Sequence, residues 1–128
     1  MMGLVPELQL AMHPALDQLD AMGIDWSQYD SDGNGEIDSV VMMHSGYDAV
    51  LGLADCQGRE PQNRIYAHAF AGSAEQAWVS ADESMRLAAY AVVSVYDGIC
   101  DDEGPATPGL TCHEYMHTMG YVLLVVLK

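Results

Sequence analysis

Two histidines four residues apart, His113 and His117, constrain the fold of this chain more than any other feature. Residues four apart project from the same face of an α-helix, because four residues make just over one turn. Neutral imidazoles at that spacing can hold one Zn²⁺ ion between them. Gly120 follows three residues after His117, where the chain is expected to turn sharply. The pattern therefore predicts a helix over residues 109–120 with a metal-binding face.

Glu114 directly follows the first of the two histidines. On a helix its side chain lies roughly a quarter-turn from His113, so its carboxylate can reach a water on the metal without being a ligand. In zinc hydrolases the metal acidifies that water and a carboxylate accepts its proton. The alternative is a surface helix that carries two histidines by chance.

The rest of the chain predicts an α/β (α+β) fold with a twisted sheet of about three to five strands. Residues 6–22 have the periodicity of an amphipathic helix, which Gly23 closes and which Pro14 either interrupts or divides in two. Its apolar stripe consists of Leu8, Met12, Ala15, Leu16 and Leu19. Strands are predicted at 39–44 and 64–70, and the apolar stretch 87–96 favours a strand over a helix. We expect the first helix and the motif helix to pack on this sheet.

A dense acidic turn lies between the first helix and the first strand. Its alternating oxygen side chains match the first nine positions of an EF-hand loop, in which closely spaced oxygens satisfy Ca²⁺. The twelfth position, a glutamate in an EF-hand, is Val41 here. The candidate calcium-binding residues are Asp30, Asp32, Asn34, Glu36 and Asp38. An Asx-rich turn that leads into the strand without an ion is the alternative.

The net charge is −15, so nucleic acid and anionic membrane surfaces are not expected as partners. Divalent cations are natural partners of so many carboxylates. The chain does not start with a basic segment and a long apolar run, so no signal peptide is predicted. The longest apolar stretch, 121–127, is too short to span a bilayer.

The three cysteines, Cys56, Cys100 and Cys112, leave two states open. Either one disulfide forms and one thiol stays free, or all three are reduced. Cys112 precedes His113 on the predicted helix and points elsewhere. We therefore expect it to be a core thiol or a disulfide partner and not a metal ligand.

Three stretches, in this order, resemble the immune inhibitor A-type metallopeptidases, a secreted family of metzincin-like zinc proteases. Residues 29–46 are similar to the family's acidic turn, apolar strand and small-residue turn. Residues 63–69 are similar to its Ile-aromatic-x-His strand, which places His68 in the pattern. Residues 109–120 have the His-Glu-x-x-His-x-x-Gly form. The resemblance covers residues 20–120.

The resemblance implies that residues 1–128 are a single, partial metallopeptidase catalytic domain. Its fold would be the metzincin-like upper subdomain, a twisted mixed sheet with an N-terminal helix and an active-site helix. The implied activity is that of a zinc-dependent endopeptidase acting on peptide or protein substrates in the extracellular space. Carried over by position, His113 and His117 are zinc ligands, Glu114 is the general base, and the acidic loop holds a structural calcium ion.

The chain departs from the metzincin pattern at the third zinc ligand, which belongs three residues after the glycine. Leu123 occupies that position, and the lower half of a metzincin does not follow. Asp101, Asp102 and Glu103 are carboxylates in the loop before the helix, but the family has no ligand there. The sequence therefore predicts a fragment or a degenerate homologue, whose activity is impaired. A calcium-binding module and an inactive remnant are the alternative functions.

Overall fold

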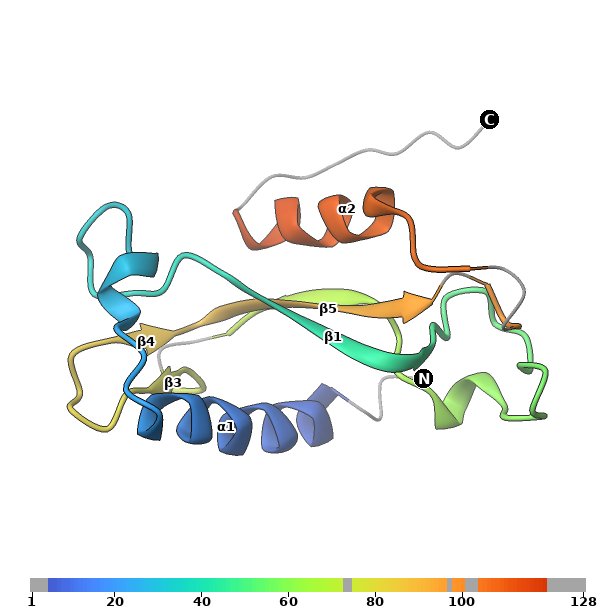
Figure 1. Ribbon diagram of the computed structural model, residues 1–128, viewed down its shortest axis with the longest axis horizontal. Coiled ribbons are helices and arrows are strands. Elements are labelled where there is room, and N and C mark those ends of the chain that lie inside the picture. The colour runs from blue at the N-terminus through green and yellow to red at the C-terminus, as the bar shows by residue number, and fades with distance from the viewer. Residues whose placement is uncertain (1–4, 73–74, 97, 101–103, 120–128) are drawn as a thin grey trace. The chain divides into compact units, whose positions relative to one another are not determined.

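The computed structural model describes residues 5–72, 75–96, 98–100 and 104–119, with a mixture of helices and strands (Figure 1). The elements are, in order, α1 (Val5–Ala21), the 3-10 helix η1 (Trp26–Tyr29), β1 (Val40–Tyr47), the 3-10 helix η2 (Pro61–Asn63), β2 (His68–Ala71), β3 (Trp78–Val79), β4 (Arg86–Leu87), β5 (Ala89–Tyr96) and α2 (Pro108–Thr118). The predicted α+β class, with a small mixed sheet, an N-terminal helix and a helix at the histidine motif, is confirmed. The chain divides into two compact units.

The first unit contains α1, η1, the acidic loop and the β3–β4 pair. α1 is one helix with Pro14 inside it, so it is not divided in two. Gly23 follows with a φ of +81°, a left-handed conformation that glycine adopts at little cost and that ends helices. The buried apolar side chains of this unit are Met12, Leu16, Trp26, Ile37, Trp78, Met85 and Leu87.

The apolar stripe of α1 is narrower than predicted. Met12 and Leu16 are buried, whereas Ala15 and Leu19 are exposed, and the side chain of Leu8 lies outside the described residues. Two tryptophans of this unit instead form hydrogen bonds with polar side chains of the same helix. Trp78 Nε1 donates to Asp17 Oδ1 at 2.8 Å, and Trp26 Nε1 donates to an oxygen of Asp20 at 2.9 Å.

The second unit contains the three-stranded sheet, in the order β1–β5–β2, and α2. β5 is the central strand, and its sequence is rich in the β-branched residues that favour strands. Its neighbours Val92 and Val93 point to opposite faces, yet each is only 1% exposed. Both faces of the central strand are therefore covered.

β2 starts at His68, four residues later than the predicted strand 64–70. The preceding backbone is bonded to the turn that follows β1. The Ala49 N–H donates to the Ile65 carbonyl at 3.1 Å, and Asp48 accepts the N–H of Ala67. Arg64 itself ends η2. These groups are bonded to that turn, so the strand begins only after them.

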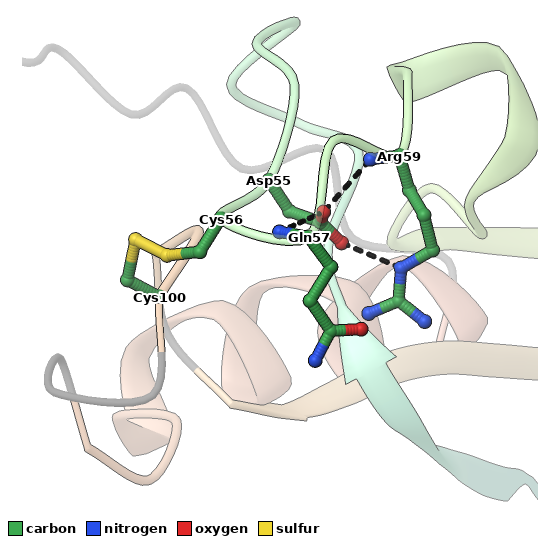
Figure 2. Close-up of a disulfide and its surroundings, with 5 residues drawn as sticks. All are labelled: Asp55, Cys56, Gln57, Arg59 and Cys100. Carbon is green, nitrogen blue, oxygen red and sulfur yellow. Dashed lines mark hydrogen bonds and ion pairs between the residues drawn. A yellow bond between two sulfur atoms is a disulfide. The ribbon is translucent and has the colours of Figure 1, made fainter.

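One disulfide, between Cys56 and Cys100, lies in the second unit (Figure 2). Cys112 is a free, exposed thiol. The two Cα atoms lie 5.2 Å apart, within the usual range for a disulfide. Of the two states that the sequence left open, the structure has the one with a single disulfide. The expectation that Cys112 is a core thiol or a disulfide partner is wrong, because its helix presents it to solvent.

Candidate metal centre

The start of α2 is fixed by the end of the central strand. The Ala106 N–H donates to the carbonyl of Val95 at 2.9 Å, and Tyr96 pairs with Pro105 in an antiparallel bridge. The chain thus doubles back along β5 before it enters α2 at Pro108. Proline is favoured at this first helical position, because its fixed φ suits a helix and its missing N–H would have no partner there.

α2 ends where the sequence predicts a turn. Met119 is the C-terminal cap residue, and its N–H donates to the Met116 carbonyl at 3.2 Å. The hydroxyl of Thr118 donates to the Tyr115 carbonyl at 2.7 Å, which satisfies another of the last carbonyls. Gly120 lies outside the described residues. The helix therefore covers the whole His-Glu-x-x-His segment, as predicted.

The two histidines of the motif face each other on this helix. The Nε2 atoms of His113 and His117 lie 3.0 Å apart, and the ring centroids are separated by 4.6 Å. Two zinc ligands at about 2.0–2.1 Å in a tetrahedral arrangement have nitrogens about 3.3 Å apart. The observed distance also fits a hydrogen bond in which one neutral ring donates to the other. The two nitrogens therefore lie close enough together to bind one metal ion.

Glu114 lies between the histidines in the sequence and is buried, with 8% of its surface exposed. Its neighbours Cys112 and Tyr115 are exposed, so the helix turns Glu114 toward its covered side. Within the described residues, no ion pair or hydrogen bond engages this carboxylate. A carboxylate next to two imidazoles in this way is suited to accept a proton.

A third protein ligand for the histidine pair is not found among the described residues. Among the described residues, only one group of three acidic, histidine or cysteine side chains brings its metal-binding atoms together. That group lies in the acidic loop. Leu123 and the loop carboxylates of residues 101–103 lie outside the described residues, so the structure does not place them.

The acidic loop is built around the side chain of Asp30. One of its oxygens accepts the N–H groups of Gly33 and Asn34 at 2.9 and 3.1 Å, and the other accepts that of Gly35 at 2.9 Å. The bond from Gly35, together with the other two, lowers the pKa of this carboxyl. Gly35 has a φ of +81°, which is why glycine suits this position.

Three carboxylates of this loop come together. Asp30, Asp32 and Asp38 each place one oxygen within 4.8 Å of the others. Asp38 also accepts the N–H of Ser31 at 3.2 Å, which holds the end of the loop back toward its start. Such a spacing of carboxylate oxygens suits a hard cation that takes many oxygen ligands.

The other two predicted calcium residues are engaged differently. Glu36 forms an ion pair with Arg86, with 3.4 Å between Oε1 and Nε. Asn34 donates from its amide to Asp32 at 3.1 Å and accepts the Glu36 N–H at 2.7 Å. The structure thus brings Asp30, Asp32 and Asp38 together, with Asn34 bonded to Asp32, whereas Glu36 pairs with an arginine.

The loop is anchored to β4 by backbone pairing. Glu36 and Arg86 form a parallel bridge, in which the Ile37 N–H donates to the Arg86 carbonyl at 2.8 Å. The Arg86 N–H donates to the Gly35 carbonyl at 3.1 Å. This pairing was not predictable from the sequence, because β4 is only two residues long.

The two strand histidines are each satisfied at one nitrogen only. His68 Nδ1 lies 2.7 Å from the Tyr66 carbonyl, and His44 Nδ1 accepts the Gly46 N–H at 3.2 Å. The Nε2 atom of each ring is buried and has no hydrogen-bond partner. Burial lowers the pKa of His44, although the charge of Asp48 acts in the opposite direction.

Sequence reasoning missed two buried charges in the stretch between β1 and β2, Asp55 and Arg64. Asp55 is buried and accepts the backbone N–H groups of Gln57 and Arg59, each at 2.9 Å (Figure 2). Its second oxygen accepts Arg59 Nε at 2.7 Å. Arg64 is buried as well, and its Nη2 donates to the carbonyl of Leu53. These residues stand in a polar, turn-rich stretch, where sequence alone does not distinguish buried charges from exposed ones.

Comparisons with known proteins leave the family of this chain open. No family model matches it, and neither the curated proteins nor the solved structures contain a significant match. Neither α-helix of the described residues is long and apolar enough to cross a membrane.

Proposed function

We propose that this chain is a zinc-dependent metalloendopeptidase domain that hydrolyses peptide bonds in peptide or protein substrates. His113 and His117 would hold the metal, and Glu114 would be the general base. The observation that carries the proposal is the approach of the two Nε2 atoms to 3.0 Å on a helix whose intervening glutamate is buried without a partner among the described residues.

The residues of the motif divide the chemistry between them. When bound, zinc would supply Lewis acidity, which lowers the pKa of a water in the site. Glu114 accepts the proton of the attacking water and passes it to the amine that leaves as the peptide bond breaks.

The resemblance to the immune inhibitor A-type metallopeptidases supports the same assignment and extends it. It suggests a metzincin-like arrangement of the sheet and the motif helix, and an extracellular location. The disulfide between Cys56 and Cys100 supports that location, because disulfides persist in oxidising compartments.

Two histidines are fewer protein ligands than a catalytic zinc site normally has. A site with only these two ligands would bind zinc weakly, and its activity would be impaired. The competing proposal is therefore an inactive metallopeptidase remnant that keeps the helix without the metal. Zinc binding separates the two proposals more directly than activity, because a weak enzyme and an inactive one can give the same assay result.

Zinc stoichiometry tests the proposal. The purified chain is stripped with a chelator, supplied with zinc, dialysed and analysed for metal content, beside His113→Ala. His13→Ala is the matched control, because it removes a helical histidine outside the motif. We expect one zinc ion per chain, lost in His113→Ala and retained in His13→Ala. Zinc content in the unmodified chain no higher than in His113→Ala would favour the remnant.

A second function is favoured by the convergence of Asp30, Asp32 and Asp38. We propose that this loop binds Ca²⁺ as a stabilising ion, either within the peptidase or as the main role of an acidic calcium-binding module. A ligand at one hundred times its dissociation constant adds about 2.7 kcal/mol to the free energy of unfolding. Calcium should therefore raise the melting temperature of the chain, and Asp38→Asn should weaken this effect. An equal rise with Asp38→Asn, or with magnesium in place of calcium, would refute a specific calcium site.

A further inference from the structure

Arg64 is a buried arginine whose charge has no carboxylate partner among the described residues. Its surface is 7% exposed, and its Nη2 donates to the Leu53 carbonyl. Nε and Nη1 are buried and have no hydrogen-bond partner. A guanidinium carries five N–H bonds, one on Nε and two on each Nη. Three of the five therefore point at no acceptor.

The other two arginines of the chain are paired. Arg59 Nε lies 2.7 Å from an Asp55 oxygen, and Arg86 Nε lies 3.4 Å from Glu36. Both of these arginine side chains are about half exposed, where pairing contributes little. Arg64 is the most deeply buried of the three arginines, and it has no carboxylate partner among the described residues.

The two aspartates that are buried among the described residues already have other partners. Asp48 accepts N–H groups from Val50 and Ala67, and Asp55 accepts two backbone N–H groups as well as Arg59. Neither forms an ion pair with Arg64. In a chain with 19 acidic residues, Arg64 is a buried arginine that none of the described carboxylates pairs with, unlike Arg59 and Arg86.

We propose that Arg64 is the anchor of an anion site that takes a carboxylate from a ligand. Burial of an unpaired charge is costly, and an anion that accepts its free N–H groups removes that cost. The planar guanidinium matches the two oxygens of a carboxylate. The net charge of −15 disfavours anions of higher charge, such as phosphates. The carboxylate is that of a small organic acid or that of a peptide, at its C-terminus or on an acidic side chain.

This site is separate from the proposed zinc chemistry and does not depend on it. Its test is a titration followed by the arginine Nε–H signals in a ¹H–¹⁵N spectrum of the full chain, which contains three arginines. Sodium acetate replaces sodium chloride at constant ionic strength, and N-acetylglycine then represents a peptide C-terminus. Arg86→Lys and Arg59→Lys assign the Arg64 signal by elimination, so that Arg64 need not be altered.

We expect the Arg64 signal to shift with acetate and to saturate, while the Arg59 and Arg86 signals stay in place. Saturation with acetate alone identifies a small organic acid as the ligand class, and tighter saturation with N-acetylglycine identifies a peptide. An Arg64 signal that does not move, that moves together with the other two, or that responds to phosphate and not to acetate overturns the proposal.

Discussion

Asp48 holds the backbone N–H of Ala67 with both of its carboxylate oxygens, at 3.2 and 3.0 Å, across 19 residues of sequence. One of the same oxygens accepts the N–H of Val50 at 2.7 Å. Asp48 follows β1 directly and Ala67 precedes β2, so one buried side chain joins the segments beside two strands that do not pair with each other. The Asp48 carboxylate therefore links the ends of β1 and β2, which have no backbone pairing with each other.

Replacing Asp48 with asparagine should destabilise the chain. The amide keeps one acceptor oxygen but adds an N–H₂ group among donors, and the charge that strengthens the bonds is lost. We expect the free energy of unfolding to fall by about 1–3 kcal/mol, measured by urea unfolding followed by circular dichroism. Glu60→Gln is the control, because Glu60 is exposed and its side chain does not cap η2. Equal stability of the two variants would show that this link is unimportant.

The sequence predicts the parts of this structure that depend on residues close together in the chain. The helix at His113 and His117, the strand at Val92 and Val93, and the turn after α1 follow from periodicity and from glycine, all of which act over a few residues. The late start of β2 and the burial of Arg64 depend on Asp48 and Leu53, which are distant in sequence. No pattern within the chain encodes those contacts.

The candidate sites likewise have features that the sequence predicts and contacts that it does not. The spacing of His113, Glu114 and His117 was sufficient to predict that the histidines share one helix face. The pairing of Glu36 with Arg86 was not predictable, because it depends on a two-residue strand 50 positions further on. The choice of Cys56 and Cys100 among three cysteines likewise required the three-dimensional arrangement, since sequence spacing does not set the distance between two Cα atoms.

The turn between β3 and β4 should make the stability of the chain sensitive to acid. The Ser80 hydroxyl donates to Asp82 at 2.7 Å, and the N–H and hydroxyl of Ser84 donate to the same oxygen. These bonds, that from Ser80 first, lower the pKa of Asp82 to about 2. The unfolded chain then binds more protons than the folded chain between pH values of about 4 and 2. Stability from this group is complete above that window and is lost as the pH falls through it.

Asp82→Asn should therefore flatten the pH dependence of stability in this window while leaving the dependence above pH 5 unchanged. Urea unfolding between pH 2 and 6 measures both slopes. Glu83→Gln alters the adjacent acidic residue, whose side chain takes no part in these bonds, and serves as the control. A slope for Asp82→Asn that equals the slope of the unmodified chain would show that the serine bonds do not set this pKa.

The disulfide should contribute a large share of the stability of the second unit. It joins cysteines separated by 44 residues, and closing a loop of that length restricts the unfolded chain. The double variant Cys56→Ser, Cys100→Ser should lose about 2–4 kcal/mol of unfolding free energy relative to the oxidised chain. Cys112→Ser, which removes the exposed free thiol, should leave stability within about 0.5 kcal/mol. Addition of a reductant should destabilise the unmodified chain and Cys112→Ser equally, but not the double variant.

Glu114→Gln separates the general base from the metal ligands. Glutamine has nearly the same size as glutamate, but its amide cannot accept a proton at neutral pH. If the proposed chemistry holds, zinc content stays at the level of the unmodified chain, because the two histidines are intact. The hydrolysis rate of quenched fluorescent peptides should fall by about 10²–10⁴-fold, the usual contribution of general acid–base catalysis.

The control for this substitution is His117→Ala, which should lose zinc and hydrolysis together. The two variants together distinguish loss of the general base from loss of the metal, because metal content and rate are measured on the same samples. Hydrolysis that persists in Glu114→Gln with zinc bound would remove Glu114 from the mechanism, whatever the histidines hold. Hydrolysis that persists in His117→Ala would place the activity outside this helix, since the helix would then offer the metal a single imidazole.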